Sequence, residues 1–225
     1  MKTLKIIKIT ELTKFDINEV VQFIHDDCIA VVAAVETNSY GIISECIPYL
    51  SKDQIEIMWK YRKESDRINY AVTKAIVNLL FSKIEKLKCE EIRWRYGKYN
   101  KPYIRNHLNL HFNISHTTGF SIVAFSRNDI GVDIENIERN IDYSEIKNNF
   151  FINNEKILGL KDFYKYWVSK EAYLKYKGVG LIQNLETVDV INKNNNVMKV
   201  IDKENNIQKE ILIFEKEKFV FALCY

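Results

Sequence analysis

Acidic and basic side chains at two places in the sequence have spacings that could do chemistry. On a strand, residues two apart share a face, which puts Asp133 and Glu135 on one side. On a helix, residues four apart are neighbours, which puts Glu171 next to Lys175. If the two faces meet, three carboxylates can surround a hard divalent cation such as Mg²⁺, with an ammonium beside it. The pattern therefore predicts a site that cleaves or transfers a phosphate group.

Each half of this pattern also has an ordinary explanation. Two carboxylates on a half-exposed strand usually form a solvated face, and a Glu–Lys pair at this spacing is common on helix surfaces. Such a pair stabilises a helix by only about 0.2–0.5 kcal/mol. The joint occurrence of both stretches, together with the motifs described below, favours a functional site.

The composition is typical of a folded globular protein. Hydrophobic residues make up 47% of the 225 residues, which is enough to bury a core as one domain or as two small lobes. Lys and Arg number 33, Asp and Glu number 30, and the formal net charge is +3. This balance argues against a dedicated nucleic-acid binder.

Cysteine usage and the apolar runs indicate a cytoplasmic protein. The four cysteines form no C-x-x-C pair, and no Cys–His cluster has zinc spacing. The longest apolar run, Cys28–Val35, is too short to span a bilayer. The N-terminus lacks the apolar core of a signal peptide. We therefore expect free thiols in a reducing compartment and no membrane partner.

Hydrophobic periodicity predicts alternating strands and helices. Strands are expected at residues 4–9, 29–35, 91–96, 111–115, 120–125, 130–135, 185–191, 197–201, 210–214 and 219–224. Helices are expected at residues 16–25, across 51–88, at 153–159 and at 163–177. Ser51 with Gln54 forms a capping-box pattern, and Gly178 is a signal for a helix end.

This order of elements predicts an α/β (α+β) fold made of two similar lobes. Each half of the chain contains strands plus one long helix, and the best boundary is the stretch at 98–102. We expect an N-terminal lobe of residues 1–105, with 1–28 as an extension, and a C-terminal lobe of residues 106–225 that carries the acidic site.

Five segments in this order resemble the 4′-phosphopantetheinyl transferase superfamily, in its longer type that activates peptide and polyketide synthetases. Each segment alone is weakly specific, but the order and spacing agree throughout. The segments are Tyr99–Pro102, Phe112–Thr117, Gly131–Glu135, Phe150–Glu155 and Trp167–Leu181, with a weaker match in the helix around Arg67.

The resemblance implies a fold and a reaction. The fold would be two α/β lobes related by a pseudo-twofold axis, with coenzyme A bound in the cleft between them. The reaction would transfer the phosphopantetheine arm of coenzyme A to a serine of an apo acyl or peptidyl carrier protein. It would release adenosine 3′,5′-bisphosphate. Because both halves of the cleft lie in one chain, a monomer is expected.

The resemblance also implies a role for each matching residue. Asp133, Glu135 and Glu171 would hold Mg²⁺, which Mn²⁺ can replace, on the pyrophosphate, and Lys175 would contact the phosphates. The other contacts to coenzyme A would be Ser115 and His116 at the 3′-phosphate, Lys101 and Pro102 at the adenine side, and Lys52 and Arg67 as further basic groups.

The chemistry of these residues fits such a reaction. Breaking a phosphoanhydride develops negative charge on oxygen, which the metal held by Asp133 and the ammonium of Lys175 would stabilise. The attacking serine hydroxyl is neutral, so a base within reach helps. Glu171 is the expected base, directly or through a water.

Two positions depart from the family pattern, and several matching residues also have structural explanations. Asn100 stands where the family usually has glycine, and Ile68 where a hydroxyl residue can contact the 3′-phosphate. The structural alternatives are turn chemistry for Ser115 and His116, a core aromatic role for Trp167, a boundary signal for Lys101 and Pro102, and a helix N-terminus for Glu155.

Two other functions compete with the transferase. A non-catalytic module that binds coenzyme A or a carrier protein would keep the motifs without turnover. A metal-dependent phosphoesterase would be expected to carry further His and Asp ligands for a second metal.

Overall fold

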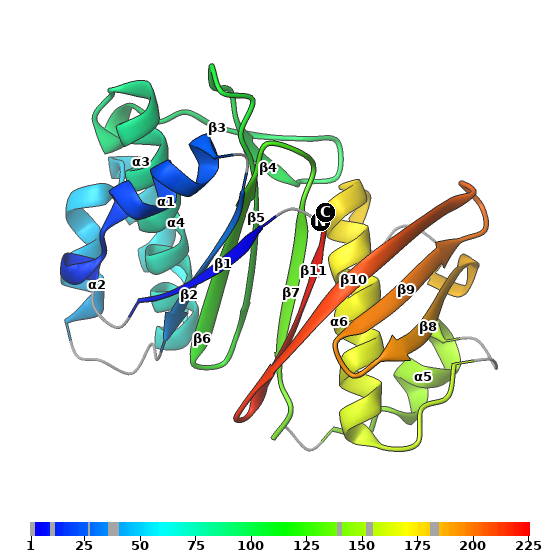
Figure 1. Ribbon diagram of the computed structural model, residues 1–225. Coiled ribbons are helices and arrows are strands. Elements are labelled where there is room, and N and C mark those ends of the chain that lie inside the picture. Colours follow the sequence, from blue (N-terminus) through cyan, green and yellow to red (C-terminus); the bar gives the residue numbers. More distant parts are fainter. Residues whose placement is uncertain are drawn as a thin grey trace. The chain divides into compact units, whose positions relative to one another are not determined.

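The computed structural model describes residues 3–9, 12–26, 28–35, 41–138, 141–151, 155–180 and 185–225. The chain divides into two compact units (Figure 1). The first contains residues 1–95 and 102–128, and the second contains residues 96–101 and 129–225. This division differs from the expected boundary at 105/106, because strands from residues 102–128 pair with strands from the N-terminal part of the chain.

The first unit is built on a sheet of order β1-β2-β6-β5. Strand β1 (Leu4–Ile9) runs parallel to β2 (Ile29–Val35), and β6 (Phe120–Ser126) is antiparallel to both β2 and β5 (His111–Thr117). Helix α1 (Ile17–His25) is capped by the Asp16 side chain, and its Val20 and Ile24 are fully buried. The N-terminal segment is therefore built into this unit rather than appended to it.

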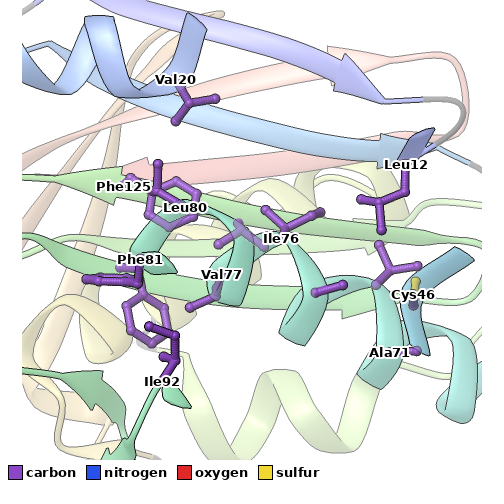
Figure 2. Close-up of a cluster of buried hydrophobic side chains, with 14 of the residues drawn as sticks. Leu12, Val20, Cys46, Ala71, Ile76, Val77, Leu80, Phe81, Ile92 and Phe125 are labelled. Carbon is purple, nitrogen blue, oxygen red and sulfur yellow. The ribbon is translucent and has the colours of Figure 1, made fainter. Parts of the chain in front are cut away.

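Helices α2 (Ile42–Cys46), α3 (Lys52–Lys60) and α4 (Glu64–Glu85) complete the first unit. Ser51 and Gln54 form the predicted capping box at the start of α3. The apolar residues of α4, spaced three and four apart, pack into one core with residues of α1, α2 and β6. Figure 2 shows part of this cluster, including Val20, Cys46, Ile76, Leu80 and Phe125.

The second unit is a sheet of order β7-β11-β10-β9-β8 with the long helix α6 (Leu160–Lys177) packed against it. The strands are antiparallel and follow one another as a meander from β8 to β11. Their bounds are β7 (Gly131–Asn136), β8 (Val188–Asn194), β9 (Val197–Asp202), β10 (Ile207–Lys216) and β11 (Phe219–Cys224).

Several expected elements differ from the structure. The helix predicted at 153–159 is wrong for residues 155–159, which are not helical, while 153 and 154 lie outside the described residues. The strand predicted from Glu91 shortens to β3 (Trp94–Tyr96), which pairs with β4 (Pro102–Ile104). Helix α5 (Ser144–Phe150) and the short α2 were not predicted, since neither presents enough periodic residues.

None of the helices in the described ranges combines the length and the hydropathy that crossing a membrane requires.

Candidate active site

Strand β7 and helix α6 carry the predicted acidic site, and both belong to the second unit. In the antiparallel ladder Asp133 lies opposite Ala222 and Glu135 opposite Val220. Cross-strand partners share a face, and Ala222 and Val220 belong to the core that also includes Ala172 of α6. The carboxylates of β7 therefore lie on the face of the sheet that α6 covers.

Gly131 lets the backbones of β7 and α6 approach each other closely. A Cβ atom at this position would lie 2.0 Å from the carbonyl oxygen of Ala172 and 2.3 Å from the amide nitrogen of Tyr176. Only glycine leaves room for this approach. The close contact brings Asp133, two residues further along β7, to the last turns of α6.

We expect Gly131→Ala to destabilise the second unit, because the added methyl group meets backbone atoms that no side-chain rotation can move. Overpacking of this kind costs about 1–3 kcal/mol. Urea unfolding followed by circular dichroism measures the effect. Gly159→Ala is the matched control, since nothing lies within 4 Å of a Cβ atom there and its φ of −177° is extended backbone. Equal stabilities of the two variants would contradict the close-approach interpretation.

Lys175 and Asp133 form an ion pair at the centre of this contact. The Nζ atom of Lys175 donates to Asp133 Oδ1 at 2.6 Å. Asp133 is 5% exposed, whereas the Lys175 side chain keeps 29% exposure. The structure thus joins the two motifs directly, and Lys175 contacts the strand carboxylate.

Glu171, one turn before Lys175 on α6, sits in the same electrostatic environment. Burial, together with the negative charges of Asp133 and Glu135, raises the pKa of Glu171 to about 7, and the charge of Lys175 opposes this shift. Its buried Oε1 atom has no hydrogen-bond partner within the described part of the chain. A buried carboxylate among like charges favours either a proton or a nearby cation.

The donor chemistry fits a hard cation, but the described side chains do not form a ready metal centre. Carboxylate oxygens are the ligands that Mg²⁺ prefers, and Oε1 of Glu171, which has no hydrogen-bond partner among the described residues, is available as such a ligand. No group of three or more His, Cys, Asp or Glu residues within the described ranges is arranged to hold a metal. Here the Lys175 ammonium is the cation in contact with Asp133.

Five of the predicted contacts to coenzyme A lie in the first unit, among them Pro102 at the start of β4. Ser115 and His116 are on β5, the former buried and the latter exposed. Lys52 opens α3 and is exposed, and Arg67 lies in the first turn of α4. Arg67 donates to the carbonyl oxygen of Tyr61 at 2.8 Å. None of these five belongs to the unit that holds Asp133 and Glu171.

The two departures from the family pattern have structural explanations. Asn100 adopts a φ of 62° in the tight turn between β3 and β4. Glycine enters this left-handed region freely, and asparagine is among the residues that tolerate it, so the turn keeps its shape. Ile68 is 6% exposed and packs into the core of the first unit, which accounts for an apolar residue there.

Sequence reasoning missed a buried ion pair that anchors α6. The Lys170 and Glu155 side chains are 0% and 1% exposed, with Lys170 Nζ 3.1 Å from Glu155 Oε2. Lys170 also donates to the carbonyl oxygens of Phe150 and Leu185, and Glu155 accepts from the amide of Val190. These contacts satisfy both charges, as buried pairs require. In the sequence, the signal that could have indicated this ion pair was Lys170, the lysine directly before Glu171.

Trp167, which shares a helix stripe with Glu171, packs among aromatic rings. Its ring stacks on Phe163 with centroids 6.1 Å apart, and it contacts Phe150 and Phe151. The core aromatic role, rather than a ligand contact, describes its surroundings in this structure. Leu181, the last residue of the matching segment, lies outside the described residues.

Comparison with known proteins identifies the family. A family model described as the 4′-phosphopantetheinyl transferase superfamily matches residues 129–224, which include β7 and α6. The chain is 28% identical over 162 residues to the 4′-phosphopantetheinyl transferase gsp of Aneurinibacillus migulanus, covering 65% of this chain and 67% of that protein. It is 31% identical over 150 residues to the 4′-phosphopantetheinyl transferase Sfp of Bacillus subtilis strain 168, covering 63% of this chain and 66% of that protein. These matches confirm the resemblance seen in the motifs, and the chain belongs to the 4′-phosphopantetheinyl transferase superfamily.

Proposed function

We propose that this chain transfers the 4′-phosphopantetheine group of coenzyme A to a serine of an apo acyl or peptidyl carrier protein, with release of adenosine 3′,5′-bisphosphate. The observation that carries the proposal is the Lys175–Asp133 ion pair together with the half-buried Glu171, whose pKa the same charges shift. This cluster lies within the residues that the family model matches. A monomeric state and a cytoplasmic location remain predictions from the sequence.

In this proposal Lys175 and Asp133 handle the pyrophosphate of coenzyme A. The side chain of Lys175 is partly exposed and Asp133 orients its ammonium, so the ammonium can bind a phosphate oxygen and stabilise the charge that develops there. Asp133, Glu135 and Glu171 would together hold Mg²⁺ or Mn²⁺, and the metal would supply Lewis-acid stabilisation of the same oxygens.

Glu171 is proposed as the group that takes the proton of the attacking serine. A general base is most effective when its pKa is near the working pH, and burial raises that of Glu171 to about 7. Its Oε1 atom, which has no partner among the described residues, is available to accept a hydrogen bond from a hydroxyl or a water.

The remaining contacts to coenzyme A rest on the resemblance. Ser115 and His116 are proposed for the 3′-phosphate, and Lys52 and Arg67 as further basic groups. Pro102 is proposed for the adenine side, where the resemblance also implies Lys101. The ammonium of Lys101, however, is already bound to two carbonyl oxygens within the second unit.

Release of adenosine 3′,5′-bisphosphate tests the proposal and separates it from the alternatives. With coenzyme A, an apo carrier protein and Mg²⁺, we expect adenosine 3′,5′-bisphosphate to be released in proportion to the amount of carrier protein that is modified. Chelation should stop release and added Mg²⁺ or Mn²⁺ should restore it, because carboxylates alone repel a pyrophosphate. Chromatography of the nucleotides measures the yield.

Two outcomes would favour the other functions. Release that needs metal but no carrier protein indicates a phosphoesterase. Binding of coenzyme A by calorimetry, without release in the presence of several apo carriers, indicates a non-catalytic module. Full transfer after exhaustive chelation would contradict the metal role of the three carboxylates.

A further inference from the structure

Lys101 lies in a short segment, residues 96–101, that belongs to the second unit although strands of the first unit flank it in sequence. Its Nζ atom donates to the carbonyl oxygens of Ile130 and Tyr176, both at 3.1 Å. Burial lowers the pKa of Lys101, and the nearby Asp129 opposes this shift. The Lys101 ammonium therefore forms these two hydrogen bonds with backbone groups inside the protein.

The two carbonyl groups mark the ends of the elements that carry the candidate site. Tyr176 is in the last turn of α6, where carbonyl oxygens have no partner within the helix and a cation is favourable. Ile130 directly precedes Gly131, at the start of β7. One side chain thus connects the end of α6 to the beginning of β7.

The surroundings hold Lys101 in this position. Its aliphatic stem covers Gly178, where an added Cβ atom would lie 3.1 Å from Lys101 Cδ. Its own carbonyl oxygen accepts a hydrogen bond from Gly97 at 2.9 Å, which closes the turn that contains Asn100. The turn, the stem and the ammonium together fix where the lysine can reach.

We propose that Lys101 is a positioning residue: its ammonium ties α6 to β7 and so holds Lys175 beside Asp133. Lys175 precedes Tyr176, and Asp133 is three residues after Ile130, so a shift at the tie moves both charged groups. The expected effect on catalysis rests on the proposed transferase function. The tie, meaning the two hydrogen bonds from Lys101 to Ile130 and Tyr176, is a property of the protein without ligand. This role differs from the direct coenzyme A contact that the resemblance implies.

Hydrogen exchange of the protein without coenzyme A tests the tie. The amides of Gly178 and Val179 both donate to the carbonyl oxygen of Leu174 and report on the end of α6. In Lys101→Met their exchange should be faster by roughly tenfold to a hundredfold, the usual effect of losing hydrogen bonds from a charged donor. Lys101→Arg, which keeps the donors, should restore part of the protection.

Lys98→Met is the matched control, because this exposed lysine of the same segment contacts the ring of Tyr99. It should leave exchange unchanged. Single-turnover transfer at saturating coenzyme A should fall in Lys101→Met by a larger factor than the affinity for coenzyme A does. Unchanged exchange with weakened coenzyme A binding would instead make Lys101 a ligand contact and overturn the proposal.

Nuclear magnetic resonance of the wild-type protein covers the case in which Lys101→Met does not fold. An ammonium held by two carbonyl groups should give a slowly exchanging ¹⁵Nζ signal without coenzyme A, and Lys98 should not. Absence of that signal would contradict the tie. Both measurements are independent of transfer, so an inactive protein would refute the proposed function without deciding the role of Lys101.

Discussion

Asp133→Ala is expected to stop transfer and to weaken metal-dependent binding of coenzyme A. The variant removes the carboxylate that orients Lys175 and takes one oxygen-rich side chain from the proposed metal ligands. Both effects act on the pyrophosphate, so they operate in the bound ground state and in the transition state. We expect the transfer rate to fall by at least about 10³-fold, at the upper end for loss of one electrostatic group.

Asp189→Ala is the matched control for this variant. Asp189 pairs with Lys203 at 2.7 Å on the same sheet, outside the proposed site, and its loss should leave transfer unchanged. Calorimetry with coenzyme A and Mg²⁺, paired with single-turnover rates, measures binding and chemistry. Wild-type affinity and rate in Asp133→Ala would exclude this carboxylate from the site.

Glu171→Gln is expected to separate chemistry from binding. Glutamine keeps the shape and one oxygen ligand but cannot take a proton. The affinity for coenzyme A should therefore remain close to that of the wild type. Proton transfer from the serine occurs only in the transition state, so the rate should fall by roughly 10²–10⁴-fold. Glu210→Gln, an exposed change of the same kind on β10, is the control.

The outcome that would contradict this role is a Glu171→Gln protein that transfers at nearly the wild-type rate. The base would then be another group, and Glu171 would serve only the metal or the fold. Equal losses of affinity and rate would also argue against a proton-transfer role, since they indicate an interaction made in both states.

Local signals in the sequence predicted the strands β7 to β11 and the helix α6 of the second unit. Asp133 and Glu135 alternate with buried residues on β7, and Gly178 ends α6 in a left-handed conformation, as the pattern required. The pairing of Lys175 with Asp133 could not be read from spacing, because Lys175 has Glu171 as its neighbour on the helix. It depends on the close approach at Gly131, which is a tertiary contact.

The sequence was least informative where long-range contacts decide the structure. Glu155 looked like a helix N-terminus, yet its partners Lys170 and Val190 lie far along the chain. The two carbonyl partners of Lys101 could not be read from the sequence either. The division into units differs from the expected boundary for the same reason, since β6 pairs with β2, which lies about 90 residues earlier in the chain.

The intact mass of an apo carrier protein, after incubation with this chain, coenzyme A and Mg²⁺, tests the proposed transfer. We expect the carrier to gain the mass of one phosphopantetheine group on a single serine, and we expect no gain with Asp133→Ala. A panel of apo carriers that stay unmodified by the folded wild-type protein, under conditions in which it binds coenzyme A, would contradict the proposed transfer.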